Sequence, residues 1–120
     1  MSLYPGTPYE YSAAANGLVF TAGACPLDGE GNVVARGDLE AQAAQAAENL
    51  LAALAAAGTG RASLLKTTIY VVASDRSDLV RAWNVIEARL GRVPSTLVGV
   101  SLLGYPDQLV EIEGIAAAAS

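Results

Sequence analysis

The sequence contains no histidine, and its single cysteine is Cys25. Without an imidazole, the chain cannot build a Ser–His–Asp triad, a histidine-ligated zinc site or imidazole acid–base chemistry. One cysteine also excludes an intrachain disulfide framework. We therefore expect no metal site. Cys25 itself has two interpretations, a reactive or ligand-contacting thiol and a small buried residue that follows a strand.

Basic residues are scarce as well, because seven Lys and Arg stand against twelve Asp and Glu, a net charge of −5. They are scattered along the chain, which argues against a basic stripe for nucleic acid and against a basic membrane-surface helix. The N-terminus lacks the charged segment and apolar run of a signal peptide. The longest apolar run, residues 50–57, is far shorter than a membrane span. The sequence therefore predicts a cytoplasmic protein that binds neither nucleic acid nor membrane.

Charged residues make up only 16% of the chain, whereas about 25% is typical. The hydrophobic share is 52%, and the length of 120 residues predicts one domain spanning residues 1–120. So low a share of charged residues indicates that part of the apolar surface is buried by self-association. The alternative is an alanine-rich composition, which raises the apolar count without adding much core.

Turn signals predict a hairpin in the first part of the chain. Asn16-Gly17 favours a tight turn between an extended piece at residues 8–12 and a strand at residues 18–22. A second turn precedes residues 32–35, which are expected to form a short strand or an extended segment.

Two long helices follow. Asp38 is expected to cap the first, whose leucines and alanines repeat at helical spacing until Gly58 ends it. Ser74 or Ser77 is expected to cap the second, which Gly91 ends.

Three further strands are predicted at residues 64–72, 93–100 and 109–116. Their alternation with the helices indicates an α+β fold, a mixed sheet with both helices on one face. Residues 64–72 are expected to be central in the sheet. Several strands are apolar on both sides, so we expect another subunit to cover the face that the helices leave bare.

The last strand carries two carboxylates, Glu111 and Glu113. Because side chains two positions apart on a strand point to one face, these two share a face, while Val110 and Ile112 share the other. If both carboxylates lay in one cleft, mutual repulsion would raise the pKa of one of them.

Several pieces of the chain, in this order and with these gaps, match a known family. They are Pro8-Tyr9, residues 19–23 with Pro26, Gly37-Asp38 with Gln42, Gln45 and Asn49, residues 65–71, Asn84, Pro94, residues 98–100 and residues 110–116. The chain thereby resembles the Rid family, also called YjgF/YER057c/UK114-like and often labelled endoribonuclease L-PSP.

The resemblance implies a chorismate-mutase-like fold and a homotrimer whose sheets form a barrel-like core. It also implies small-molecule ligands in clefts between the subunits and no cofactor. The founding branch of the family hydrolyses reactive enamines and imines, such as 2-aminoacrylate, to 2-keto acids and ammonia.

The resemblance further implies roles for individual residues. Glu111 would hold the attacking water as the catalytic residue. Tyr9, Asn84 and a hydroxyl residue of the segment at Thr21 would line or support the cleft. Tyr105 is either a residue of the cleft rim or a loop aromatic that packs on its neighbours.

The chain departs from the family pattern at the arginine that clamps the substrate carboxylate in a bidentate pair. Depending on the register, Ser95 or Thr96 takes the arginine position, and the cysteine two residues further on is Leu97. Arg92 precedes Pro94 and is the last basic residue of the sequence. The hydroxyls of Ser95 and Thr96 suit a polar neutral ligand, so we expect 2-imino acids to be poor substrates.

Two functions of different class follow. One is a cofactor-free hydrolytic deaminase of enamine- or imine-type compounds other than 2-imino acids, with Glu111 handling water. The other is a non-catalytic module that binds a small metabolite in the same cleft. A ribonuclease or translation inhibitor follows from family labels alone, and the acidic charge and missing histidine weigh against it.

Overall fold

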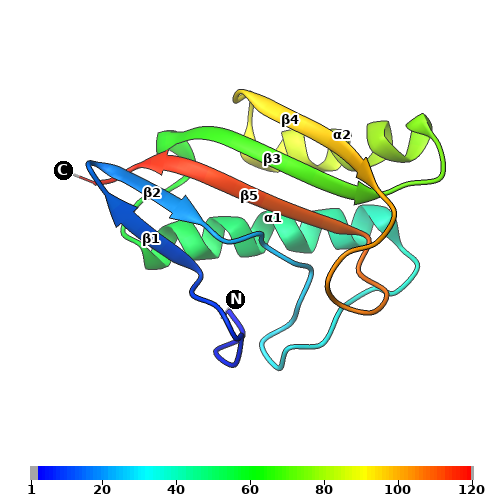
Figure 1. Ribbon diagram of the computed structural model, residues 1–120. Coiled ribbons are helices and arrows are strands. Elements are labelled where there is room, and N and C mark those ends of the chain that lie inside the picture. The colour runs from blue at the N-terminus through cyan, green and yellow to red at the C-terminus, as the bar shows by residue number, and fades with distance from the viewer. Residues whose placement is uncertain (1–2, 120) are drawn as a thin grey trace.

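The computed structural model describes residues 3–119 and shows a five-stranded mixed sheet with two helices packed on one face (Figure 1). The helices are α1 (Leu39–Ala56) and α2 (Arg76–Leu90), and a short 3-10 turn, Arg61–Ser63, lies between them. The α+β class and the placement of both helices on one face are thereby confirmed. The strands are β1 (Ser12–Ala15), β2 (Leu18–Thr21), β3 (Leu64–Val72), β4 (Ser95–Val100) and β5 (Val110–Ala117), in the spatial order β1-β2-β5-β3-β4.

The first two strands form the expected hairpin. Asn16 and Gly17 both have positive φ, 54° and 79°, which a two-residue turn of this twist requires. The first strand lies later than expected, because β1 begins at Ser12 and residues 8–11 precede it. Residues 32–35 form no strand of their own, and one isolated bridge joins Leu27 to Val33.

The helix ends follow local chemistry. Asp38 caps α1 by accepting a hydrogen bond from the Ala41 N–H at 3.0 Å, and Gly58 follows the helix with a φ of 82°. The serine cap expected for α2 was wrong. Asp75 caps this helix by accepting from the Ser77 N–H at 2.8 Å, because a carboxylate competes well for that position.

Strand β3 lies between β5 and β4, as expected of a central strand. It runs parallel to β4 through the crossover of α2, and antiparallel to β5. Strand β5 also pairs with β2, so it joins the hairpin to the rest of the sheet.

The core lies between the sheet and the helices. In β5, Val110, Ile112 and Ala116 are fully buried and pack with Leu50 and Leu54 of α1. The intervening carboxylates, Glu111 and Glu113, are half-buried on the other face, which confirms the predicted alternation.

The face of the sheet away from the helices keeps apolar side chains exposed. Phe20 of β2 is 43% exposed and Val98 of β4 is 36% exposed. Between residues 3 and 119, no helix is both long and apolar enough to cross a membrane.

Candidate functional site

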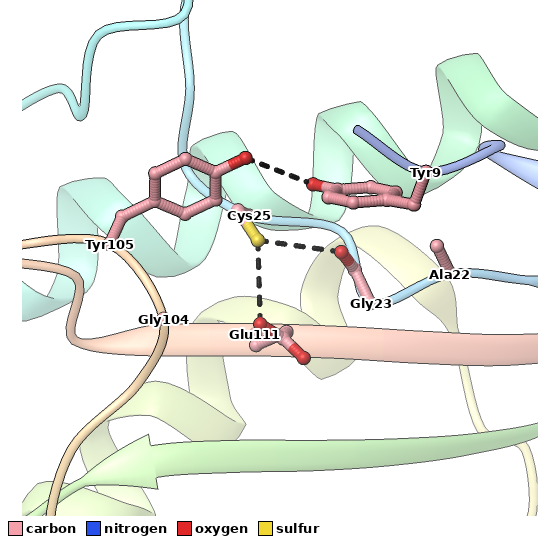
Figure 2. A pocket seen from close by; sticks show the side chains of 7 residues that line it. All are labelled: Tyr9, Ala22, Gly23, Cys25, Gly104, Tyr105 and Glu111. Carbon is pink, nitrogen blue, oxygen red and sulfur yellow. Dashed lines mark hydrogen bonds between the residues drawn. The ribbon is translucent and has the colours of Figure 1, made fainter. Parts of the chain in front are cut away.

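A cavity of about 280 Å³ opens at the end of the sheet where β5 begins (Figure 2). Four segments that are distant in the sequence contribute to it: the stretch before β1, the stretch after β2, the loop between β4 and β5, and β5 itself. Its lining consists of Tyr9, Ala22, Gly23, Cys25, Gly104, Tyr105 and Glu111.

The segment after β2 reaches the site because it continues alongside β5. Ala24 and Ile112 exchange two backbone hydrogen bonds, of 2.7 and 3.1 Å. This bridge places Gly23 and Cys25 on either side of Ala24 and next to the Glu111 carboxylate. The side chain of Asn49 on α1 secures the same segment by donating to the backbone carbonyls of Cys25 and Leu27, at 2.8 and 2.9 Å.

One oxygen of the Glu111 carboxylate is held by two neutral donors. The Cys25 thiol lies 3.4 Å from Oε1, and the Gln108 side-chain amide donates to the same oxygen at 3.2 Å. No donor among residues 3–119 hydrogen-bonds to the other oxygen, Oε2. It lies against Gly23, where a β-carbon would be 2.6 Å from Glu111 Cγ and closer still to the carboxylate. A side chain at position 23 would therefore displace the Glu111 carboxylate.

The environment keeps the Cys25 thiol protonated. Burial, followed by the negative charge of Glu111 and the hydrogen bond to it, raises the pKa of Cys25 to about 12. A thiol with such a pKa is a poor nucleophile at neutral pH, so the reactive-thiol interpretation loses its basis. Cys25 instead acts as a hydrogen-bond donor, with Glu111 Oε1 and the Gly23 carbonyl each 3.4 Å from its sulfur.

Two phenols form the opposite wall. The hydroxyls of Tyr9 and Tyr105 point toward each other (Figure 2), and their oxygens are 3.3 Å apart. Partial burial, followed by this hydrogen bond, raises the pKa of Tyr9 far above its ordinary value. Tyr9 therefore stays a neutral hydrogen-bond donor throughout the physiological range of pH.

The loop that carries Tyr105 is anchored by two buried glutamines. Gln108 accepts a hydrogen bond from the Tyr105 N–H at 3.1 Å while its amide reaches Glu111. Gln42 on α1 accepts from the Leu109 N–H at 2.8 Å and donates to the Asp107 carbonyl at 3.0 Å. The loop, the helix and the carboxylate are thereby connected by hydrogen bonds.

The structure brings only two of the predicted site residues, Tyr9 and Glu111, into this cavity. Thr21, the last residue of β2, lies at a second cavity of about 360 Å³, where its hydroxyl accepts from the Gly114 N–H of β5 at 2.9 Å. Glu113 also lines the second cavity, and the Tyr70 hydroxyl donates to it at 2.5 Å.

The other three predicted ligand residues lie elsewhere in the chain. Ser95 makes a 2.6 Å hydrogen bond with Thr67 on the side of the sheet that faces the helices. The Thr96 hydroxyl accepts from the Lys66 ammonium at 2.7 Å, and Asn84 is exposed on α2. Ligand contacts by these residues stay a prediction.

Sequence reasoning missed Gln108. Nothing local marks a glutamine in a loop as a partner of a carboxylate three residues later, and only the folded loop turns its amide onto Glu111. As to metals, no group of three or more Cys, Asp or Glu side chains within residues 3–119 is placed to hold an ion.

Comparisons with known proteins agree with this fold. The family model described as Endoribonuclease L-PSP matches residues 1–118. A RutC family protein of Pyrococcus horikoshii is 33% identical over 113 residues, which cover 93% of this chain and 88% of the relative. The 2-iminobutanoate/2-iminopropanoate deaminase of Salmonella typhimurium is also 33% identical over 113 residues, 91% of this chain and 86% of that protein.

Among solved structures, the conserved Rid family protein YyfA of Yersinia pestis superposes with a TM-score of 0.85 at 28% identity. The alignment covers 96% of this chain and 93% of that one. Nearly the whole length of the chain is thus matched in both sequence and structure. The chain therefore belongs to the endoribonuclease L-PSP family, the Rid or YjgF family that its sequence resembles.

Proposed function

We propose that this protein is a cofactor-free hydrolytic deaminase that acts on small enamine- or imine-type compounds other than 2-imino acids. The observation that carries the proposal is the geometry of Glu111. Glu111 lines the cavity, two neutral donors hold its Oε1, and no donor of the described chain hydrogen-bonds to its Oε2. A carboxylate oriented in this way suits the activation of a water molecule.

The reaction needs only water and proton transfers. Glu111 takes a proton from water as its oxygen attacks the carbon of the C=N bond. Glu111 passes this proton to the nitrogen, which gives the neutral carbinolamine. The nitrogen then receives a second proton, from Glu111 or along a hydrogen bond with Tyr9, while the carbinolamine hydroxyl gives up its own proton to restore the donor, and ammonia leaves. The balance is R₂C=NH + H₂O → R₂C=O + NH₃. An enamine first takes a proton at carbon and becomes the imine.

The substrate is proposed to differ from that of the Salmonella relative, whose name states deamination of 2-iminobutanoate and 2-iminopropanoate. Those substrates carry a carboxylate, and this sequence has no arginine between Val93 and Val100 to pair with it. None of the cavity residues is basic. A carboxylate entering beside Glu111 would be repelled and would lose hydration without compensation.

The working assembly is proposed to be a homotrimer with small-molecule ligands bound between subunits. Within one chain, Glu111 of β5 lies opposite Tyr70 of β3, whereas Ser95 of β4 lies opposite Thr67 of β3. Thr67 and Tyr70 are three residues apart on β3, so Glu111 and Ser95 are separated by roughly 10 Å along the strand direction. Ser95 also faces the helices, and Glu111 faces away from them. Contact of both residues with one ligand therefore requires a second subunit.

The test measures ammonia release from two kinds of imine generated enzymatically in the same mixture. An amine oxidase acting on small primary amines supplies carboxylate-free imines, and an amino-acid oxidase supplies 2-iminopropanoate. We expect acceleration above spontaneous hydrolysis for the former and little for the latter. Glu111→Gln should abolish the acceleration, and Glu113→Gln, the control on the same face, should retain it.

Robust acceleration of 2-iminopropanoate hydrolysis that depends on Glu111 would refute the proposed substrate preference. Ligand binding at the cavity without acceleration of any imine would instead favour the non-catalytic binding module.

A further inference from the structure

We infer that the Glu111 cavity selects ligands with a cationic C–N group, such as an iminium or amidinium, over isosteric neutral and anionic ligands. The inference rests on the proposed function in that it concerns the same cavity. It concerns only the ligand charge that the cavity prefers, however, so it can be tested without measuring turnover.

The first argument is charge. Of the seven lining residues, Glu111 alone carries a formal charge. No Lys or Arg lines the cavity. Two of the basic residues contact groups elsewhere, since Arg36 pairs with Asp107 at 3.5 Å and the Lys66 ammonium donates to Thr96. Within one chain, the cavity therefore presents a carboxylate without a counter-charge, which a cationic ligand would supply.

The neighbours of Glu111 do not cancel this charge. The thiol of Cys25 and the amide of Gln108 are neutral dipoles, and both act on Oε1. Burial and Glu111 raise the pKa of Cys25, and burial and Tyr105 raise that of Tyr9, so neither adds a second negative charge near neutral pH. The site keeps one negative charge.

The second argument is direction. With Oε1 occupied by two donors, Oε2 is the oxygen that can accept from a ligand. An N–H that carries positive charge makes a shorter and stronger hydrogen bond to a carboxylate than a neutral N–H does. The rest of the wall is small or aromatic, with Ala22 and Gly23 on one side and two tyrosine rings on the other. The face of a tyrosine ring attracts a cation through a cation–π interaction.

The preference has a chemical consequence for the proposed reaction. The protonated imine is the better electrophile, and its hydrolysis balances as R₂C=NH₂⁺ + H₂O → R₂C=O + NH₄⁺. A cavity that prefers the cation would concentrate the form of the substrate that water attacks most readily.

The test uses three unreactive probes with the same four-heavy-atom skeleton: acetamidinium, acetamide and acetate. Each is titrated into the full-length protein at low salt, and binding is followed by chemical shifts of the backbone amides around Gly23 and Glu111. We expect affinity to fall in the order acetamidinium, acetamide, acetate. Glu111→Gln should weaken acetamidinium binding by roughly ten- to a hundred-fold, the range for a hydrogen bond to a charged group. Glu113→Gln should leave the order and the affinity unchanged.

Tighter binding of acetate than of acetamidinium would overturn the inference, and so would an absence of acetamidinium binding up to the highest concentration tested. An equal loss of acetamidinium affinity in the Glu111→Gln and Glu113→Gln variants would overturn the inference as well. Acetamidinium binding without acceleration of any imine would refute the hydrolase and leave the charge preference standing. The reverse result, acceleration by a protein that prefers acetate, would leave the hydrolase and refute the preference.

Discussion

Cys25 and Glu111 are 86 positions apart in the sequence, and the thiol of the first donates to Oε1 of the second at 3.4 Å. The contact relates a residue with no charge to the only charged residue of the cavity. It limits both the reactivity of the thiol and the mobility of the carboxylate. A change at Glu111 should therefore alter measurable properties of the Cys25 thiol.

Removal of the Glu111 charge should therefore change the thiol. Glu111 is the second-largest cause, after burial, of the raised Cys25 pKa of about 12, so Glu111→Gln should lower this pKa. At a given pH below 12 the variant then holds more thiolate, and alkylation by iodoacetamide becomes faster. Unfolded protein, whose thiol has an ordinary pKa, should react fastest at pH 8.

Greater access rather than a lower pKa would also speed alkylation, so a second measurement is needed. The S–H stretching band in the infrared belongs to Cys25 alone, because the chain has no other cysteine. Glu111→Gln should shift this band to higher wavenumber as the hydrogen bond weakens, and Glu113→Gln should not. An unchanged band in Glu111→Gln would show that the thiol donates to its other acceptor, the Gly23 carbonyl at 3.4 Å, and would contradict the hydrogen bond to Glu111.

Gly23→Ala should displace the Glu111 side chain. The added β-carbon would overlap the carboxylate, so we expect the loss of acetamidinium binding and of any imine hydrolysis. The free energy of unfolding should fall by about 1–3 kcal/mol, the cost of overpacking. Binding titrations and denaturant unfolding measure the two effects.

Gly60→Ala is the matched control for this substitution. Gly60 has an extended φ of −170°, and the described residues place nothing within 4 Å of a β-carbon there. Its stability change should stay within about 0.5 kcal/mol. If Gly23→Ala binds acetamidinium as the unmodified protein does, the close contact between Gly23 and Glu111 does not constrain the site.

The exposed face of the sheet predicts the state of the protein in solution. Light scattering at micromolar concentration should give three times the 12.2 kDa mass of one chain. Phe20→Glu should lower the mass, because a trimer that covers this face would bury an unpaired charge. Val80→Glu, on the 55% exposed Val80 of α2, should leave the mass unchanged. A single-chain mass for the unmodified protein would refute the trimer.

Much of the fold could be predicted because its signals are local. Asn16-Gly17 specifies a tight turn through the positive φ that both residues adopt, and Asp38 caps α1 through its own carboxylate. The cap of α2 could not be read with the same certainty, because Ser74, Asp75 and Ser77 can all accept from a nearby N–H. Which of them does so depends on where the chain leaves β3.

The candidate site was predictable only in part. Glu111 could be singled out from its place on a strand and from the family pattern, and its orientation away from Val110 and Ile112 follows from the period of two. Its partners could not be found in this way. Cys25 and Gln108 lie in irregular segments, where no repeating pattern relates sequence position to direction.

The sequence by itself determined the kinds of element, their order and the face on which Glu111 lies, because turn, cap and alternation preferences act over a few residues. Only the tertiary structure decided which groups surround Glu111. The bridge between Ala24 and Ile112 brings Cys25 to Oε1, and the buried glutamines Gln42 and Gln108 hold the loop that closes the cavity. These contacts join segments far apart in the chain, so they form only once β5 has been inserted between β2 and β3.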